Sequence, residues 1–348
     1  MATVKIGDRW VGDGEPCFII AEAGSNHDGK LEQAIRLIDV AASAGADAVK
    51  FQLFRADKLY TRNAGQSGYL NSAKPIYDIV NALEMPYEWL PKLMDYCRTK
   101  GLLFLSSVFD EDSADRLAPY VECFKIASYE MTHIPLIRYV GQKGKPVIIS
   151  TGTADLDEID GTVKEFNTTG NNDLILMQCT AAYPAPLESL NVRAIATMKS
   201  KFGLPVGLSD HSIDPTLAPL IAVAVGANLI EKHFTLSRKL PGPDHRFAIE
   251  PDELHTMIRK VRDAELALGS GEKKMHSVES ELRRFARRTI IAIRDIDAGE
   301  MFTKENIGVL RPGVLPMGLP PKAYLTVLGR RAKKQILANS TIYQTDIA

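Results

Sequence analysis

Apolar runs rich in valine and isoleucine alternate with amphipathic segments over about the first 270 residues of the 348-residue chain. This alternation is typical of strands and helices that build a parallel sheet. Eight strands are expected, at Cys17–Glu22, Ala48–Gln52, Leu102–Ser106, Cys123–Ala127, Val147–Ser150, Leu174–Cys179, Pro205–Leu208 and Asn228–Glu231. Apolar residues at helical spacing predict helices over Leu31–Ala44, Pro86–Thr99 and Glu253–Leu268.

The positions of the polar residues distinguish between two folds that share this alternation of strands and helices. They follow most of the expected strands, as Lys50, Ser106, Ser150 and His233 do, rather than collecting near one point. A TIM barrel builds its active site from the carboxyl ends of all eight strands, whereas a doubly wound open sheet concentrates it at one switch point. The spread therefore favours the barrel, with the open sheet as the alternative.

The pattern changes after Gly269. Residues 271–288 are polar and charged, and they predict a linker. Residues 289–348 show short strand-like runs, glycine turns and prolines, which indicate a small β-rich domain at the limit of what folds alone. We therefore expect a barrel domain over residues 1–270, the linker, and a second domain.

Composition excludes some partners and indicates a compartment. A net charge of -1 and a pI near 6.7 give no electrostatic footprint for nucleic acid or an anionic membrane. The longest apolar stretch, Leu217–Ile230, is interrupted by Pro219 and Gly226 and is too short to span a bilayer. Four scattered cysteines suit a reducing environment, so a cytoplasmic protein is expected.

His211 and His233 stand at the ends of the seventh and eighth strand-like runs. Two neutral imidazoles from neighbouring strand ends can hold one divalent metal and leave positions open for substrate. Glu231 precedes His233 by two residues, so the strand period puts both on one face and Lys232 on the other. The hypothesis is a catalytic metal site, and the alternative is two hydrogen-bonded core histidines. His27 is an undecided third candidate.

Lys50 and Lys125 lie inside apolar strands, where a lysine is costly to bury unless it meets an anion. With Ser128 and Ser150 they form a candidate cradle for phosphate and carboxylate. Structural ion pairs with barrel carboxylates are the alternative.

Two carboxylates can supply such ion pairs. Glu22 ends the first strand and Glu130 follows the fourth. Each either balances the lysines or binds sugar hydroxyls, and the residues alone leave both readings open. The turn Gly242–His245 after the eighth strand belongs either to the site or to an ordinary surface loop.

With these residues in view, the chain resembles the sialic acid synthase family, which condenses phosphoenolpyruvate with acyl sugars. Its bacterial branch, including spore-coat polysaccharide relatives, is the most similar. The segments that carry the resemblance are Phe18–Gly29 (FIIAEAGSNHDG), Gly45–Gln52 (GADAVKFQ), Phe124–Glu130 (FKIASYE), Ser150–Gly152 (STG), Cys179–Pro186 (CTAAYPAP), Val206–Ser212 (VGLSDHS), Ile230–Thr235 (IEKHFT) and Gly242–His245 (GPDH). Leu310–Gly313 (LRPG) resembles the family's antifreeze-like (SAF) domain.

The resemblance implies roles for individual residues. It implies that His211 and His233 hold manganese, with magnesium or cobalt as alternatives. The residues that would bind phosphoenolpyruvate are Lys50, Lys125, Ser128, Ser150 and Ser209. Those that would meet or surround the acyl sugar are Glu130, Asp244, Gln52 and Tyr183, with Arg311 reaching in from the partner of a domain-swapped homodimer. Glu231 is the candidate base for an attacking water, and Glu22 is its rival or partner.

Two positions depart from the family's pattern. Many relatives have asparagine where Ala181 stands, which puts one phosphate contact in doubt. The family's proline after Ser106 and Ser107 is Val108 here, which puts the conformation of that loop in doubt.

The expected activity joins phosphoenolpyruvate to the open aldehyde form of an N-acyl hexosamine and releases phosphate. N-acetylmannosamine, giving N-acetylneuraminate, is the default sugar. A 2,4-diacetamido-6-deoxymannose, giving legionaminate, is the next candidate, and pseudaminate is less favoured. Whether the sugar carries a 6-phosphate stays open. The competing hypotheses are a non-catalytic carbohydrate-binding barrel and a different phosphoenolpyruvate aldol enzyme.

Overall fold

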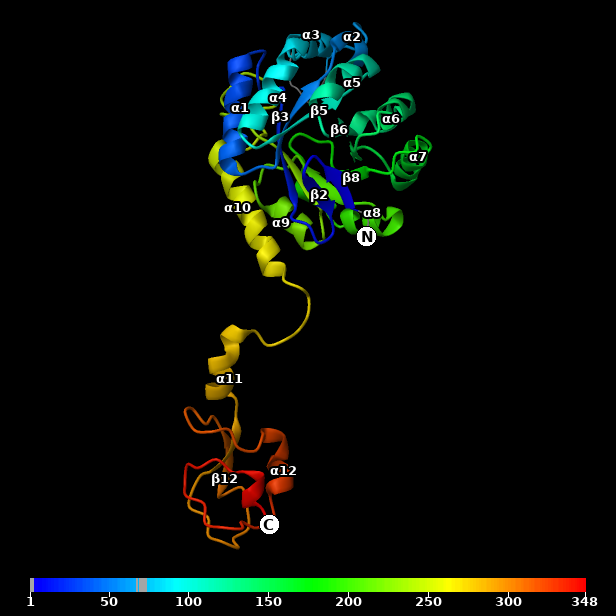
Figure 1. Ribbon diagram of the computed structural model, residues 1–348. Helices are drawn as coiled ribbons and strands as arrows, with labels where there is room; N and C mark the ends of the chain where they lie inside the picture. Colours follow the sequence, from blue (N-terminus) through cyan, green and yellow to red (C-terminus); the bar gives the residue numbers. More distant parts are fainter. Residues whose placement is uncertain (1–2, 67, 69–73) are drawn as a thin grey trace. The chain divides into compact units, whose positions relative to one another are not determined.

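Eight parallel strands close into a barrel in the computed structural model, which describes residues 3–66, 68 and 74–348. Figure 1 shows the helices outside this ring of strands. The strands are β3 (Phe18–Gly24), β4 (Ala48–Leu53), β5 (Leu103–Val108), β6 (Phe124–Ile126), β7 (Val147–Ser150), β8 (Leu174–Cys179), β9 (Val206–Asp210) and β10 (Leu229–His233). They follow one another around the ring in chain order, and β10 closes it by pairing with β3. The predicted TIM barrel is confirmed, and the open sheet is excluded.

The helices cover the ring and bury their apolar stripes against its outer face. They are α1 (Leu31–Ala44), α4 (Leu90–Thr99), α5 (Glu111–Leu117), α6 (Ile134–Gly141), α7 (Leu156–Asn167), α8 (Ala194–Phe202), α9 (Leu217–Ala224) and α10 (Pro251–Leu268). Two short helices, α2 (Ala56–Leu59) and α3 (Ile76–Ala82), follow β4. Helix α7 begins in a capping box in which Asp155 accepts from Glu158 and the Glu158 side chain accepts from Asp155. The predicted helix over Pro86–Thr99 is instead a 3₁₀ turn at Tyr87–Trp89 followed by α4.

Side chains inside the barrel form an apolar layer and a polar layer, because alternate residues of each strand face inward. The apolar cluster includes Phe18, Ile20, Ala48, Leu105, Cys123, Ile148, Ile175, Met177 and Leu229. Two residues further along β3, β4 and β10, the same faces carry Glu22, Lys50 and Glu231, all buried. The strand period thus stacks a charged layer directly on the apolar one.

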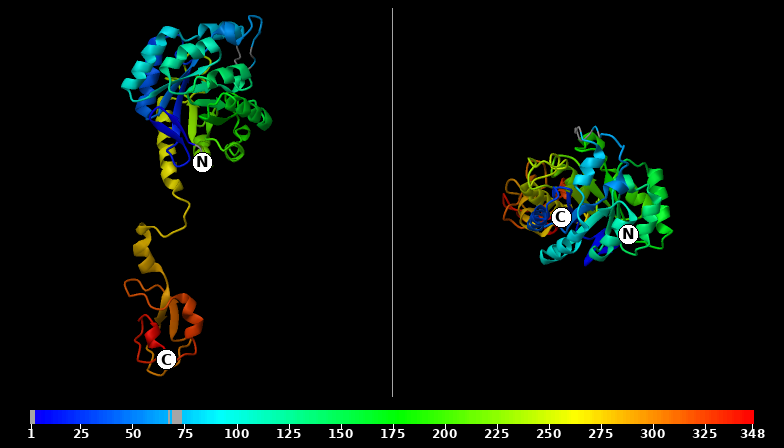
Figure 2. Two further views of the ribbon diagram at one scale, coloured as in Figure 1. Left: turned by 45° about the vertical axis from the view of Figure 1, so that its right-hand side comes forward. Right: turned by 90° about the horizontal axis from the view of Figure 1, so that it is seen from above.

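A β-hairpin at the amino end of the chain was not predicted. Strands β1 (Thr3–Ile6) and β2 (Arg9–Gly12) pair in antiparallel fashion. Val4, Ile6 and Val11 join the apolar cluster inside the barrel. Figures 1 and 2 show the hairpin at the end of the barrel opposite α2 and α3. It therefore closes the end where the strands begin.

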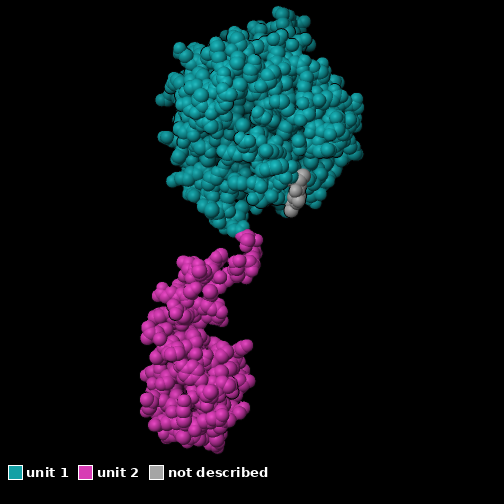
Figure 3. Space-filling view, viewed as in Figure 1, with its two compact units in different colours: residues 1–269 teal, residues 270–348 magenta. Residues whose placement is uncertain are grey.

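The described residues divide into two units, Met1–Gly269 and Ser270–Ala348, coloured separately in Figure 3. The second unit contains α11 (Ser280–Ala286), strands β11 (Thr289–Ala292) and β12 (Ile307–Leu310), and α12 (Tyr324–Val327). The two strands form an antiparallel pair. Its own core includes Ile290, Ile296, Phe302, Ile307 and Ile342. A core of this size is typical of a domain near the lower limit of independent folding.

Candidate active site

Four charged side chains meet in the polar layer of the barrel. Lys50 Nζ lies 2.8 Å from Glu22 Oε2 and 3.5 Å from Glu231 Oε1, and it donates to Ser107 Oγ at 3.1 Å. Lys125 adds a second buried ammonium group, and its Nζ donates to Ser150 Oγ at 2.7 Å. Two cations and two carboxylates thus lie together in this layer. Lys50 is ion-paired with both carboxylates, whereas Lys125 donates to Ser150 and to the carbonyl oxygen of Ile126, so an anion could bind beside Lys125.

Burial and mutual charge set the protonation states of this group. Burial raises the pKa of Glu22 to about 7, even though Lys50 opposes the shift. Burial acts on Glu231 in the same direction, but Lys125, Lys50 and His211 outweigh it and lower its pKa. Burial also favours neutral lysines: it prevails at Lys125, whose pKa is lowered, whereas the carboxylates prevail at Lys50, whose pKa is raised. Two neighbouring carboxylates with pKa values shifted apart are typical of acid–base sites.

The ends of β6, β7 and β8 form a small polar cradle beside Lys125. The amide of Gly152 donates to Ser128 Oγ at 3.0 Å, and Ser128 Oγ donates to Cys179 Sγ at 3.4 Å. A Cβ on Gly152 would stand 2.8 Å from Ser128 Oγ, so only glycine fits at this position. With Ser150 on Lys125, this places hydroxyls and an ammonium group close together, as anion binding requires.

His211 and His233 face each other above the charged layer, with ring centroids 5.4 Å apart. The Nδ1 atom of His211 lies 2.9 Å from the carbonyl oxygen of Thr180, which indicates that Nδ1 carries a proton. Nδ1 of His233 is buried without a hydrogen-bond partner in the described structure. Burial, followed by the charge of His211, holds the pKa of His233 well below its ordinary value. His233 is therefore suited to act as a neutral ligand. At His211, burial lowers the pKa, but Cys179 and the carbonyl of Thr180 outweigh it and raise the pKa, so this ring would have to lose a proton to bind a metal.

Aromatic rings enclose the histidine pair on one side. The Tyr183 ring lies 4.2 Å from that of His211 and meets His233 edge-on at 6.1 Å, and Phe247 lies 5.2 Å from His233. Among the described residues, no group of three or more His, Cys, Asp or Glu side chains is arranged to hold a metal. The protein thus offers two imidazoles, and other ligands would have to complete a coordination shell.

Behind the histidines, Lys232 Nζ and Asp210 Oδ2 form an ion pair of 2.6 Å with both side chains almost fully buried. Lys232 also donates to the carbonyl oxygens of Ser212 and Asp214. Asp210 accepts in turn from the amide of Ser212. The pair ties β9, β10 and the loop after His211 together from the outer face of the barrel, as the strand period predicts for Lys232.

A β-bulge at the end of β3 brings three further polar groups together. The pairing between β3 and β4 shifts between Glu22 and Gly24. Gly24 has a φ of 54°, and a Cβ there would meet Glu22 Oε1, Gln52 Nε2 and Asp244 Oδ2 at 3.3 to 3.5 Å. Gln52 Nε2 donates to Glu22 Oε1 at 2.9 Å, and Ser25 Oγ donates to Asp244 Oδ2 at 3.3 Å. The bulge thus links the charged layer to the loop that follows β10.

Other predicted residues lie near this centre in different ways. Ser209 Oγ donates to Glu231 Oε1 at 3.3 Å, so it orients a carboxylate in the present arrangement. Glu130 is buried beside the mouth with Oε2 unpartnered in the described structure, and burial raises its pKa to about 7. His27 packs edge-on against Trp89 at 5.5 Å, and burial lowers its pKa to about 4. Arg311 is exposed in the second unit.

The two departures from the family's pattern have definite places. Val108 is fully buried as the last residue of β5, where it pairs with Leu53 and Ile126. The strand therefore continues through the position at which relatives have proline. Ala181 is half-buried, and its Cβ would lie 3.1 Å from a Cβ on Gly152, beside the serine cradle.

Several contributors were missed from the sequence. Ser107 contacts Lys50 and Ser25 contacts Asp244, while Asp210 pairs with Lys232 behind the two histidines. The polar run Ser209–Ser212 at a strand end was a usable signal for Asp210, but its partner could not be identified without the fold. Asp28 and His245 were also missed as a pair: Nε2 of His245 lies 3.0 Å from Asp28 Oδ1 and holds the loop that carries Asp244.

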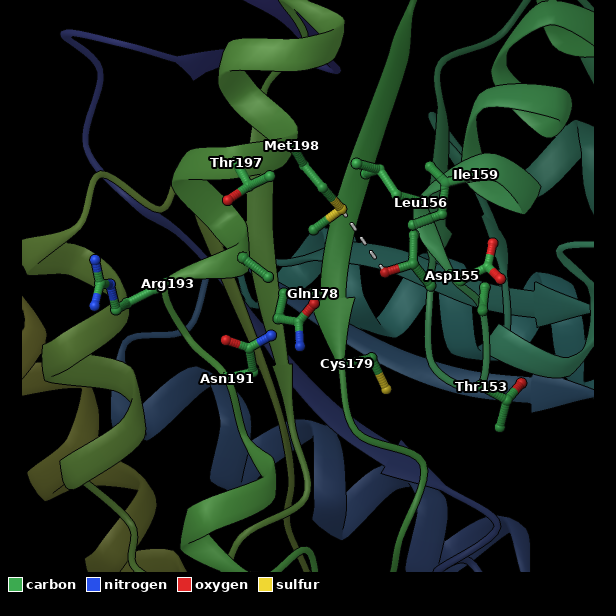
Figure 4. A pocket seen from close by; sticks show the side chains of 13 residues that line it. Thr153, Asp155, Leu156, Ile159, Gln178, Cys179, Asn191, Arg193, Thr197 and Met198 are labelled. Carbon is green, nitrogen blue, oxygen red and sulfur yellow. Dashed lines mark hydrogen bonds between the residues drawn. The ribbon is translucent and has the colours of Figure 1, made fainter.

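A cavity of about 160 Å³ opens at the mouth of the barrel and is lined in part by Gln52, Tyr183, His233 and Asp244. A larger pocket of about 380 Å³ lies beside the ends of β7 and β8, against α7 and α8 (Figure 4). Figure 4 shows Arg193 and Asn191 on one side of that pocket and Thr153 on the other. None of the predicted site residues lines it, so we assign the candidate site to the smaller cavity.

Within the described part of the chain, no helix combines the length and apolar character that crossing a bilayer requires.

Comparison with protein families confirms the resemblance found in the sequence. The model of the NeuB family matches residues 37–273, and the model of the SAF domain matches residues 287–348.

Individual proteins agree with this assignment. The spore coat polysaccharide biosynthesis protein SpsE of Bacillus subtilis is 46% identical, with 100% of this chain and 98% of that protein covered. Its crystal structure matches with a TM-score of 0.69 and 44% identity, covering 100% of this chain and 99% of that one. The N,N'-diacetyllegionaminic acid synthase of Legionella pneumophila is 40% identical, covering 95% and 94% of the two chains. The crystal structure of N-acetylneuraminic acid (sialic acid) synthetase from Leptospira borgpetersenii serovar Hardjo-bovis matches with a TM-score of 0.74 and 35% identity over 81% of this chain and 95% of that one. The chain belongs to the NeuB family and carries an SAF domain at its carboxyl end.

Proposed function

We propose that the protein is a nonulosonic acid synthase that condenses phosphoenolpyruvate with the open aldehyde form of an N-acyl hexosamine. The observation that carries this proposal is the stacked site: two buried lysines and two carboxylates lie beneath a facing pair of histidines. The named relatives, which include synthases of legionaminic and N-acetylneuraminic acids, support the same reaction class. Burying four charges costs free energy, and a barrel that only binds sugar would not need those charges in its interior.

Lys50 and Lys125 are the anchors for the phosphate and carboxylate of phosphoenolpyruvate. Ser150, Ser128 and the Gly152 amide lie beside Lys125 and supply further hydrogen bonds. These contacts hold the methylene carbon of phosphoenolpyruvate against the aldehyde carbon, which removes most of the entropic barrier to a three-component reaction. The new carbon–carbon bond leaves positive charge at carbon 2, where water adds before the bond to the phosphate oxygen breaks.

The residues present fit a divalent metal, since both imidazoles are buried and turned toward each other, and His233 is held in the neutral form. His211 and His233 would hold it, and it would supply Lewis-acid polarisation of the aldehyde carbonyl. Two protein ligands leave several positions for water and sugar oxygens. Manganese is the metal that we propose, by analogy with the family.

Glu22 is the group that we propose to take the proton from the attacking water. Its pKa of about 7 makes it half-ionised at neutral pH, whereas the lowered pKa of Glu231 makes that carboxylate a weaker base. Glu231 instead neutralises Lys50 and is oriented by Ser209. This reverses the order of preference that the sequence alone gave for the two carboxylates.

Asp244 and Gln52 are proposed to bind sugar hydroxyls, because the bulge at Gly24 brings them to the mouth beside Glu22. Tyr183 and Tyr129 line the same cavity, and Glu130, which follows Tyr129 in the chain, is a further candidate.

We also propose a domain-swapped homodimer in which Arg311 completes the site of the partner subunit. Within the second unit, the apolar side chains of Val278, Leu282 and Val314 are 85%, 63% and 92% exposed, and a partner subunit could cover them. The amide of Gly313 donates to the carbonyl of Phe285, so the loop beside Arg311 is attached to α11.

We further propose a cytoplasmic location. The four cysteines are buried and unpaired, which supports it.

A coupled phosphate-release assay with manganese and a panel of acyl sugars tests the function. Phosphate release that requires both substrates, together with a condensed sugar acid identified by mass spectrometry, is expected. Phosphate and pyruvate without condensed sugar would contradict the proposal. Metal binding is measured separately by manganese electron paramagnetic resonance. His211→Ala should lose the bound signal, and His255→Ala, an exposed histidine on α10, should keep it.

A further inference from the structure

The cavity at the barrel mouth has two chemically different halves. One half is polar and comes from the strand ends and the loop after β10, with Ser25, Gln52, His233 and Asp244. Since the histidines mark where an aldehyde oxygen would sit, this half receives the reacting end of the sugar.

The other half is formed by α2, α3 and the residue that follows β4. Its lining includes Phe54, Leu59, Ile76, Ile79, Val80 and Leu83. Ile79, Val80 and Leu83 are only half-buried, so their apolar side chains are open to the cavity. Figures 1 and 2 show α2 and α3 together at the end of the barrel opposite the hairpin. An extended sugar chain that begins at His233 would place its far carbons against this wall.

Polar groups in this second half are few and uncharged. They are the phenol hydroxyls of Tyr60 and Tyr129, and no lysine or arginine is among the described residues that line the cavity. The charged residue on the lining is Asp244, a carboxylate. Among the described residues of one subunit, the lining would offer a phosphate group the carboxylate of Asp244 and no cation, and free hydroxyls facing the aliphatic wall would lose their hydrogen bonds to water.

We propose that the acceptor sugar is apolar at its far end, as in a 6-deoxy hexose with an acylated amine at carbon 4, and that α3 selects it. The methyl of carbon 6 and the acyl methyl would pack on Ile79, Val80 and Leu83. The tyrosine hydroxyls would serve the amide carbonyl. This inference rests on the proposed function and replaces N-acetylmannosamine as the expected sugar by a 2,4-diacetamido-6-deoxymannose.

The test compares kcat/KM of the full-length protein with manganese for three sugars: the 2,4-diacetamido-6-deoxy sugar, N-acetylmannosamine and N-acetylmannosamine 6-phosphate. Removing apolar contacts of about one methylene each changes kcat/KM by about 10- to 200-fold. The deoxy sugar should therefore exceed N-acetylmannosamine by at least about tenfold, and the phosphorylated sugar should give no turnover.

The double variant Ile79→Thr/Val80→Thr makes the wall polar with little change of volume at Val80. It should lower the preference for the deoxy sugar about tenfold, while leaving the dissociation constant of phosphoenolpyruvate unchanged. Val225→Thr, a half-buried valine at the end of α9, is the matched control and should keep the preference. Equal or better use of N-acetylmannosamine by the wild type would overturn the inference and leave the proposed function standing. Condensation with none of the sugars would overturn both.

Discussion

Lys232 and Asp210 form a buried ion pair of 2.6 Å, and each of them directly precedes one of the two facing histidines. The charges lie on the outer face of the barrel while the imidazoles lie on the inner face, so one contact fixes both strand ends from behind. Removing one partner of such a pair leaves an uncompensated buried charge, which costs about 3–5 kcal/mol.

Lys232→Met should therefore lower the free energy of unfolding by about 3 kcal/mol or more, measured by urea denaturation. Lys164→Met, which breaks the largely exposed pair with Asp160, is the control and should change it by less than about 1 kcal/mol. Equal losses in the free energy of unfolding would show that the buried pair stabilises the fold no more than the exposed pair does. Manganese affinity should also weaken in Lys232→Met, because the loop after His211 loses the hydrogen bonds from Lys232 to the carbonyl oxygens of Ser212 and Asp214.

Glu22→Gln and Glu231→Gln should differ in their pH profiles. The base must be ionised, so kcat/KM of the wild type should fall as pH drops below about 7. Glu22→Gln should lose about 10²-fold or more in kcat and flatten this limb, while Glu231→Gln should keep it. If instead Glu231→Gln flattens the limb and Glu22→Gln retains it, the assignment of the base is reversed.

Gly24→Ala should damage the site more than the fold. A left-handed alanine costs about 1 kcal/mol, and its Cβ would press on Glu22, Gln52 and Asp244. Gly101→Ala is a matched control, since Gly101 has a φ of 72° and open space around it. Both variants should lose similar stability in urea titrations. Loss of kcat/KM for the sugar should occur in Gly24→Ala alone, and normal activity there would separate the bulge from catalysis.

Glu130 should make the protein less stable as pH rises. Its folded pKa of about 7 exceeds the ordinary value of 4.5, so the folded state binds the proton more tightly than the unfolded state does. The stability contributed is present below pH 4.5 and is lost as pH rises toward 7. Relative to Glu130→Gln, the wild type should lose up to about 3 kcal/mol between pH 4.5 and 8. A pH-independent difference in urea unfolding would mean that Glu130 is not desolvated.

Arg311→Ala and His211→Ala test the swapped dimer together. Each should be nearly inactive alone if Arg311 serves the partner's barrel. Refolded together in equal amounts, half of the dimers are mixed, and each mixed dimer has one intact site of two. Activity should therefore recover to about a quarter of the wild type, by the two-fold symmetry of the dimer. Verified mixed dimers without recovery would place Arg311 in its own subunit's site.

The pattern of apolar runs predicted the strands of the barrel, with differences mainly at their ends. β7 and β8 begin and end as predicted, because each is a compact run of bulky apolar residues. β9 and β10 extend to Asp210 and His233, beyond the predicted ends, because polar residues continue the strand after the apolar run stops. The period of two placed Glu231 inside and Lys232 outside correctly.

What the sequence could not supply were relationships between distant segments. The hairpin β1–β2 was missed because each strand has only four residues, although the alternation of Val4 and Ile6 before the turn at Gly7 was a signal. The partner of Lys232 and the β3 bulge that brings Asp244 to Glu22 depend on neighbours far away in the chain. His27 proved to be a core residue packed on Trp89, which no local pattern distinguishes from a ligand.

The hairpin has a consequence for the order of events during turnover. Val4, Ile6 and Val11 complete the apolar cluster that fills the end of the barrel where the strands begin, so a ligand reaches the polar layer from the other end. Phosphoenolpyruvate, if it occupies the lysine layer, lies deeper than a sugar held at Gln52 and Asp244. The deeper ligand must then enter first, and a sugar that arrives early blocks the passage. Excess sugar should accordingly act as a competitive inhibitor toward phosphoenolpyruvate, although the hairpin Thr3–Gly12 itself touches neither substrate.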